Sequence, residues 1–173
     1  MGKPTLTQVL KVHDPMLADN FDMVFEKVVG NPEGPASIEN LTVQCKTAVK
    51  PGSQMAEVEV ELFGHKVMHG AKRTWSNDMQ IEFVEDANGM ITKTMENWLE
   101  QIREIETQHG HFKKDYATNA KFTIYDQEGE SQAEYKIHNI WPADVSELSF
   151  DGSGGQALNT QVSFKFDHVT REK

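Results

Sequence analysis

Apolar residues and glutamates alternate strictly over residues 56–62, which read AEVEVEL. Successive side chains of an extended strand point to opposite faces, so this period of two places the apolar residues on one face and the glutamates on the other. On a helix, the same glutamates would be spread around the axis. The segment is therefore predicted to be a β-strand whose acidic face carries Glu57, Glu59 and Glu61.

Strand-like patterns recur along the chain, and turn residues separate them. Besides the acidic strand, the predicted strands cover residues 21–25, 38–48, 75–83, 121–125, 133–137 and 156–168. The fourth and fifth of these six are expected to form a hairpin. After that hairpin, Trp141-Pro142 is expected to bend the chain.

One segment, from residue 90 to about 108, has the period of a helix instead, and Gly110 is expected to close it. Its apolar stripe consists of Ile91, Met95, Trp98, Leu99, Ile102 and Ile105. Several short strands and a single helix indicate a mainly β protein, an antiparallel β-sandwich or barrel with one flanking α-helix. The 173 residues fit one domain, residues 1–173.

Composition narrows the possible functions. The net charge of −10 argues against a protein that grips nucleic acid, because gripping depends on Lys and Arg neutralising phosphates. Cys45 is the only cysteine, and its alternation with Leu41 and Val43 predicts a small buried side chain rather than a nucleophile. No apolar run reaches the roughly 20 residues of a membrane helix, and residues 1–15 lack a signal-peptide core, so an intracellular product without membrane insertion is expected.

No pattern of residues indicates catalysis, a metal or a cofactor. The pairs His65/His69 and His109/His111 lack a third ligand and are interpreted as solvated histidines. Residues 152–155 (GSGG) are glycine-rich but are not followed by the Lys-Ser/Thr pair of a phosphate-binding loop. Catalytic residues, metal ligands and cofactors are therefore all predicted to be absent.

Three stretches, taken in order, resemble the tail tube family of contractile-tailed bacteriophages. They comprise residues 43–64, residues 79–86 with the helix at 95–102, and residues 120–125, 135–142 and 160–167. The helix between two sets of strands and the Trp-Pro before a glycine-rich loop carry much of the resemblance. Residues 1–18 have no counterpart and are interpreted as an N-terminal extension, and residues 32–35 fall in a variable region.

The resemblance implies a non-enzymatic virion protein that assembles in the host cytoplasm into the phage tail. Its homohexameric rings would stack into a tube through which DNA passes without specific binding. The implied partners are other copies of the chain and the tail sheath, baseplate and tail terminator proteins. Tube proteins of type VI secretion systems and phage-like bacteriocins share this fold and stay open as alternatives. A small β-barrel that binds a ligand or acts as an enzyme is the alternative from another class.

Within the tube, the segment from Lys50 to Gly70 is the expected contact with the neighbouring ring, because in the family a long hairpin there reaches across the stack. Its candidate residues are Lys50, Pro51, Gly52, Gly64 and Gly70. Glu57, Glu59 and Glu61 are expected to face either the lumen or a subunit interface, where mild repulsion would let DNA slide.

Overall fold

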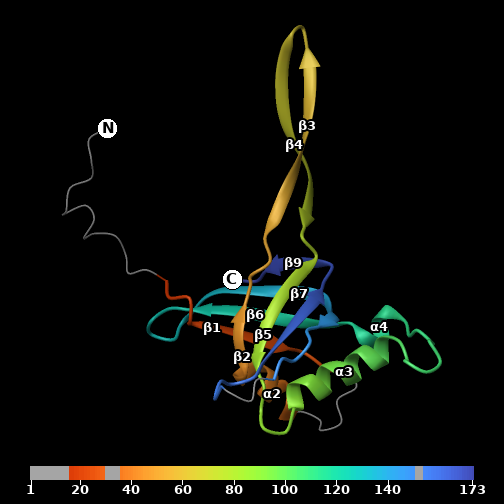
Figure 1. Cartoon of the computed structure of the whole chain (residues 1–173). Coiled ribbons are helices and arrows are strands. Elements are labelled where there is room, and N and C mark those ends of the chain that lie inside the picture. Colours follow the sequence, from red (N-terminus) through yellow and green to blue (C-terminus); the bar gives the residue numbers. More distant parts are fainter. Residues whose placement is uncertain (1–15, 30–35, 151–153) are drawn as a thin grey trace.

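A computed structural model describes residues 16–29, 36–150 and 154–173 of the chain. Its body is an antiparallel sheet in the order β1-β6-β7-β8-β5-β2, with β9 paired to β7 (Figure 1). The bounds of these strands are β1 Phe21–Phe25, β2 Cys45–Ala48, β5 Asp78–Val84, β6 Thr118–Tyr125, β7 Ser131–Val145, β8 Asn159–Lys165 and β9 His168–Arg171. The predicted mainly β, antiparallel architecture is confirmed.

Strand β7 takes part in both layers of a sandwich. Its first half pairs with β6 and β9, and its second half, from Trp141, pairs with β8. Asn139 has a positive φ of 55°, and the register shifts between Pro142 and Asp144. The bend predicted near Trp141-Pro142 therefore lies inside a continuous strand, and the predicted hairpin of β6 and β7 is confirmed.

Aromatic side chains fill the space between the layers. The Phe25 and Phe164 rings lie 5.4 Å apart, and Trp98 packs edge-on against both, at 6.0 and 6.2 Å. The core contains, among others, Met23, Met79, Ile81, Phe83, Met95, Ile137, Ile140 and Val162. Because each strand turns alternate residues inward, the part of the core from β5 and β8 follows directly from their period-two patterns, and β1, β7 and α3 supply the rest.

Helix α3 (Met90–Ile102) is shorter than the predicted 90–108 helix. Ile91, Met95 and Trp98 are buried and Leu99 and Ile102 are half-buried, as the stripe predicted. Ile105 is 76% exposed, so its assignment to the stripe was wrong. The helix ends because Arg103 is extended and pairs with Gly110, and the Glu104 N–H bonds to the His109 carbonyl, which folds the chain back.

Two more helices were missed, α2 (Ala36–Val43) and α4 (Lys113–Tyr116). The prediction of strand for residues 38–43 was wrong, although β2 does occupy the end of that segment. Leu41 is 1% exposed whereas Val43 is 83% exposed, which contradicts a shared face. Thr42 Oγ1 bonds to the Ile38 carbonyl one turn earlier, at 3.0 Å. A short apolar run fits either a strand or a buried helical turn. In residues 38–43 the helical turn forms, and it places Leu41 in the core.

Asn77 lies where both the predicted 75–83 strand and the predicted 156–168 strand are interrupted. Asn77 has a positive φ of 55° and separates Trp75 from β5, so the predicted 75–83 strand begins at Asp78. Its side-chain amide donates to the carbonyls of Phe166 and Asp167, each at 2.8 Å, where the predicted 156–168 strand divides into β8 and β9. Within the described residues, no helix is both long enough and apolar enough to span a membrane.

Candidate assembly site

A two-stranded hairpin projects from the body, and we call it the arm (Figure 1). It consists of β3 (Ser53–Leu62) and β4 (His65–Trp75), which form a sheet of their own. A two-residue turn of Phe63 and Gly64, with φ of 52° and 77°, closes it. Such turns need positive φ at both positions and match the twist of the strands, so Gly64 fits this place well.

The cross-strand pairs give the arm two different faces. Glu57, Glu59 and Glu61 lie opposite Gly70, Met68 and Lys66 on one face, which confirms the predicted strand and its acidic stripe. Lys66 Nζ lies 2.6 Å from Glu59, and Gly70 stands beside a bulge between Met55 and Glu57. All three glutamates are exposed in the single chain.

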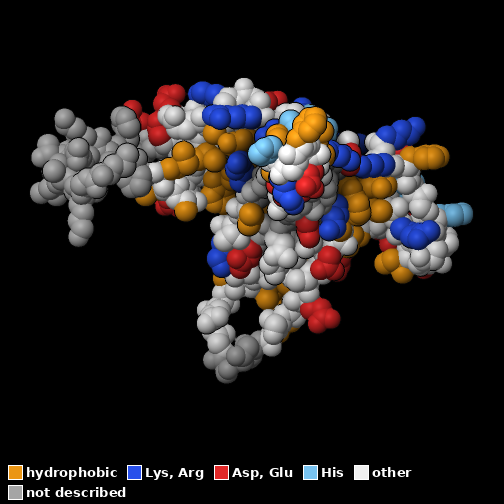
Figure 2. Space-filling view, turned by 90° about the horizontal axis from the view of Figure 1, so that it is seen from above, with side chains coloured by type: hydrophobic (Ala, Val, Ile, Leu, Met, Phe, Trp, Pro, Cys, Tyr) orange, Lys and Arg blue, Asp and Glu red, His pale blue; other side chains and the backbone are white. Residues whose placement is uncertain are grey.

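The other face of the arm is apolar, with histidines at both ends. Val58 lies opposite His69, Val60 opposite Val67, and Leu62 opposite His65. Val58, Leu62 and Val67 are each about half exposed, and Phe63 at the tip is 100% exposed. Figure 2 looks down onto the arm and shows hydrophobic and histidine side chains at its end. An isolated hairpin is marginally stable in water, so a surface of this kind is suited to burial against another molecule.

The structure places all five predicted contact residues on the arm or at its foot. Lys50, Pro51 and Gly52 lead from β2 into β3, Gly64 is at the tip, and Gly70 is in β4. His65 and His69, interpreted above as solvated histidines, lie in β4 and are exposed. The adjacent apolar residues Val67 and Met68 and then Gly70 break the alternation that would have revealed this strand. Among the described residues, no three His, Cys, Asp or Glu side chains are grouped to hold a metal.

Each of the two edge strands of one layer has one side without a hydrogen-bonded neighbouring strand among the described residues. In the order β7-β8-β5-β2, the second half of β7 and the outer side of β2 have no paired strand among the described residues. The sequence patterns predicted the strands but did not indicate which would lie at the edges. Unpaired backbone groups at such edges can accept a strand from another chain.

The exposed face of that layer is polar and carries two ion pairs, and among the described residues the exposed Asp144, opposite Ser163, is an acid on it without an ion pair. Lys46 lies 3.1 Å from Glu82, and Lys165 lies 3.3 Å from Asp78. Between them, the Gln161 side-chain amide donates to that of Gln80 at 3.1 Å. This face therefore presents amides and neutralised pairs rather than a block of acidic charge.

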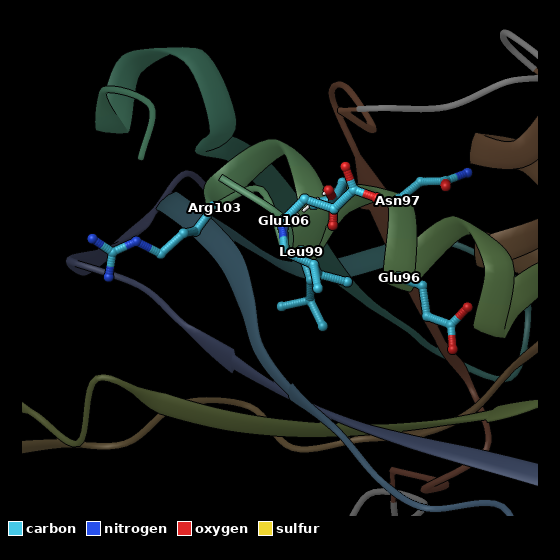
Figure 3. A pocket seen from close by; sticks show the side chains of 7 residues that line it. Glu96, Asn97, Leu99, Arg103 and Glu106 are labelled. Atoms are coloured by element: carbon cyan, nitrogen blue, oxygen red, sulfur yellow. Dashed lines mark hydrogen bonds between the residues drawn. The ribbon is translucent and has the colours of Figure 1, made fainter. Parts of the chain in front are cut away.

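Cys45 and a hollow along α3 give no sign of chemistry. Burial, with a smaller contribution from Asp22, raises the pKa of the Cys45 thiol to about 12, so the thiol stays protonated and a poor nucleophile. A hollow of about 740 Å³ lies along α3 and is lined by Glu96, Asn97, Leu99, Glu100, Arg103, Ile105 and Glu106. In Figure 3 the side chains of Glu96, Asn97 and Arg103 point in different directions, so they do not converge on a common point.

The arm, the open edges and the sandwich together define a subunit built to assemble with other chains. The family model described as phage tail tube protein matches residues 15–171, and the chain belongs to that family. It is a structural tube protein and not an enzyme, as the resemblance implied. Among curated proteins, none matches the sequence.

Solved structures with a similar fold come from contractile injection assemblies. The sheath/tube terminator of an extracellular contractile injection system (PVC) has a TM-score of 0.65 at 11% identity, covering 94% of this chain and 99% of that one. The tube-terminating cap of the anti-feeding prophage has a TM-score of 0.62 at 14% identity, covering 94% and 93%. The PVC sheath-tube complex in the extended state has a TM-score of 0.60 at 10% identity, covering 98% and 99%.

Proposed function

We propose that six copies of this chain close into a ring, that the rings stack into the inner tube of a phage tail, and that DNA passes through the tube. The observation that carries the proposal is the arm, a ten-residue strand and its partner exposed on both faces. At roughly 3.3 Å per residue, the arm reaches about 30 Å beyond the body. That length is suited to contact with a neighbouring ring.

Ring closure would use the two open edges of one layer. If β2 of one copy pairs with the second half of β7 in the next, the same heterologous contact repeats until the ring closes. Every edge of this layer would then be paired, which removes the liability of exposed strand edges. Strands β2 and β5 lead directly into the arm, so this layer and the arm would form one continuous surface along the tube.

The polar face of this layer is our candidate for the channel wall. Both of its lysines named above are paired, as Lys46–Glu82 and Lys165–Asp78, and Asp144 adds one acidic charge, so a DNA duplex would meet no cationic grip and only a mild repulsive field. Passage without specific binding follows from such a wall. The acidic residues Glu57, Glu59 and Glu61 would lie further along, on the arm, facing the lumen or a subunit interface.

The enclosing partners are proposed from the related assemblies. The similar structures include a sheath-tube complex and a sheath/tube terminator. We therefore propose tail sheath, baseplate and tail terminator proteins as partners of this chain. Assembly would take place in the host cytoplasm, and the final location would be the virion tail.

A second candidate is a tube of a phage-derived injection or secretion device. The similarity to the anti-feeding prophage and PVC structures favours it, since both are contractile injection assemblies. The two candidates share the ring and the arm and differ in what passes through the channel. Neighbouring genes separate them: capsid and portal genes indicate a phage, and their absence beside toxin or secretion genes indicates a device.

Electron microscopy of the purified full-length chain tests the proposal. Rings, or filaments of stacked rings, are expected, and sedimentation should give a hexamer as the smallest stable assembly. A stable monomer at high concentration would overturn the proposal, because the open edges and the arm would then need no partner.

A further inference from the structure

A small hollow of about 190 Å³ lies at the foot of the arm, where β3 and β4 meet the body, and we call it the foot pocket. Two strand pairs bring its walls together: Ser53 lies opposite Trp75 in the arm, and Tyr135 lies opposite Arg171 in the body. Its polar and aromatic lining is Lys50, Ser53, Arg73, Trp75, Tyr135 and Arg171.

Three of these residues are cations, and no acidic residue lines the foot pocket. Lys50 Nζ lies 4.6 Å from the centre of the Tyr135 ring, and the Arg73 guanidinium carbon lies 6.0 Å from the centre of the Trp75 ring. Six lysines elsewhere form ion pairs with carboxylates, but within the described part of the chain Lys50, Arg73 and Arg171 form none. In a chain of net charge −10, this cluster of uncompensated positive charge stands out.

Glu134 and Glu172 are each next in sequence to a residue of the lining, and Glu134 is paired with Lys121. Glu172 also acts elsewhere. It follows Arg171, and the alternation of an extended chain turns its side chain to the opposite face. The pKa values of Lys121 and Lys136 are raised mainly because these lysines donate hydrogen bonds to Glu134 and Glu26, and the charge of Glu172 adds to the effect. Arg171 Nε donates a hydrogen bond to the backbone oxygen of Lys173, which leaves its other guanidinium N–H groups, together with Arg73 and Lys50, to meet another molecule.

We propose that the foot pocket binds a carboxylate side chain of a second copy of this chain in the next ring of the stack; this inference rests on the proposed function. Like charges held close together in a hollow repel, and a bound anion relieves that repulsion. The forked donors of arginine match the geometry of a carboxylate. The volume lies below the roughly 300 Å³ at which small-molecule sites begin, and it suits one acidic group.

The charged residues at the two opposite ends of the folded subunit indicate what occupies the foot pocket. The arm and the foot pocket lie at one end, and Figure 2 shows Lys and Arg side chains around the arm, with some acidic side chains among them. Toward the other end lie α2, with the exposed Glu39, and the start of β8, where the exposed Glu147 lines a hollow (Figure 1). When rings stack in one direction, each foot pocket faces the acidic end of the next copy.

The test compares purified full-length Arg73→Glu and Arg171→Gln with the wild type and with Lys72→Glu as the matched control. Lys72 is exposed on the same strand next to Arg73 but does not line the foot pocket. Sedimentation measures ring formation, and electron microscopy measures the ring concentration at which filaments appear. We expect both foot-pocket variants to form rings and to need at least about tenfold higher ring concentration to stack, with the control unchanged.

The outcomes separate this inference from the proposed function. A wild type that forms no rings overturns the proposed function, whereas foot-pocket variants that stack like the wild type overturn only this inference. Arg171→Gln removes the charge without introducing an opposite one and keeps a polar side chain, so it decides the matter if Arg73→Glu fails to fold. Binding of a short DNA duplex to wild-type rings that Arg171→Gln abolishes, with stacking intact, would assign the foot pocket to phosphate and overturn the carboxylate.

Discussion

Thr160 in β8 donates a hydrogen bond of 2.8 Å to the carboxylate of Glu85, 75 positions earlier in the chain. The same carboxylate accepts the backbone N–H groups of Ile91 and Thr92, at 2.8 and 3.0 Å, in the first turn of α3. These N–H groups have no partner within the helix, and an acidic group near them is favoured. Glu85 therefore caps α3 and ties it to the body.

Replacing Glu85 should loosen the attachment of α3. Glu85→Ala removes the acceptor of four hydrogen bonds and leaves Thr160, which is fully buried, without this partner. We expect the free energy of unfolding to fall by about 1–3 kcal/mol. Urea denaturation followed by circular dichroism measures it. Glu96→Ala, on the exposed side of the same helix, is the control and should change stability by less than about 0.5 kcal/mol.

Reversing the acidic face of the arm should impair the tube. The triple change Glu57→Lys, Glu59→Lys and Glu61→Lys turns three negative charges into positive ones along one exposed face. Cations at a lumen would attract DNA phosphates, and cations at an interface would lose their matched partners. We expect slowed DNA release or blocked stacking, measured by ejection kinetics and electron microscopy. Unchanged assembly and infectivity would show that these glutamates face bulk solvent in the tube.

Cys45 should resist alkylation in the folded chain. Its pKa of about 12, raised chiefly by burial, leaves almost no thiolate at pH 8, and the thiolate is the reactive form. Iodoacetamide should therefore modify the native protein at least about tenfold more slowly than the urea-unfolded protein. Mass spectrometry of timed samples gives both rates. Equal rates would mean that the side chain is open to solvent.

Asp167 should make stability sensitive to acid. The Lys113 side chain is the main cause of its lowered pKa, and Asn139 also donates to it, at 2.7 Å. Because the folded pKa lies below the unfolded value, this stabilisation is present above the unfolded pKa of about 4 and is lost as the pH falls through the folded pKa. Comparing urea midpoints from pH 7 to pH 3 measures it. The wild type should lose its advantage over Asp167→Asn in acid, and a constant difference would contradict the assignment.

Local sequence patterns predicted the presence of the strands better than their positions in the fold. The alternation at residues 56–62 correctly gave a strand, but the same pattern fits a strand packed on a core and a strand that projects alone. Pairing with β4 alone, away from the body, decides between them, and the adjacent Val67 and Met68 with Gly70 obscured the alternation of β4 in the sequence. Ile105 continued a helical spacing, yet the pairing of Arg103 with Gly110 had already turned the chain.

The candidate site shows the same division. The segment from Lys50 to Gly70 could be proposed from the sequence because its composition and its family resemblance are both local properties. The foot pocket was not found, because Arg73 and Arg171 lie almost a hundred positions apart and meet only through the register of β3, β4, β7 and β9. Periodicity within a segment carries no information about such a meeting.

Because one backbone, β7, runs through both layers, the layers are joined by covalent bonds as well as by packing. A force that acts on one layer along the axis of a stack is transmitted to the other layer through the peptide bonds of β7. Separating the layers would require deforming the backbone of β7 near Asn139, and not only breaking the apolar contacts between the two layers. The subunit is thereby made to bear load as a unit.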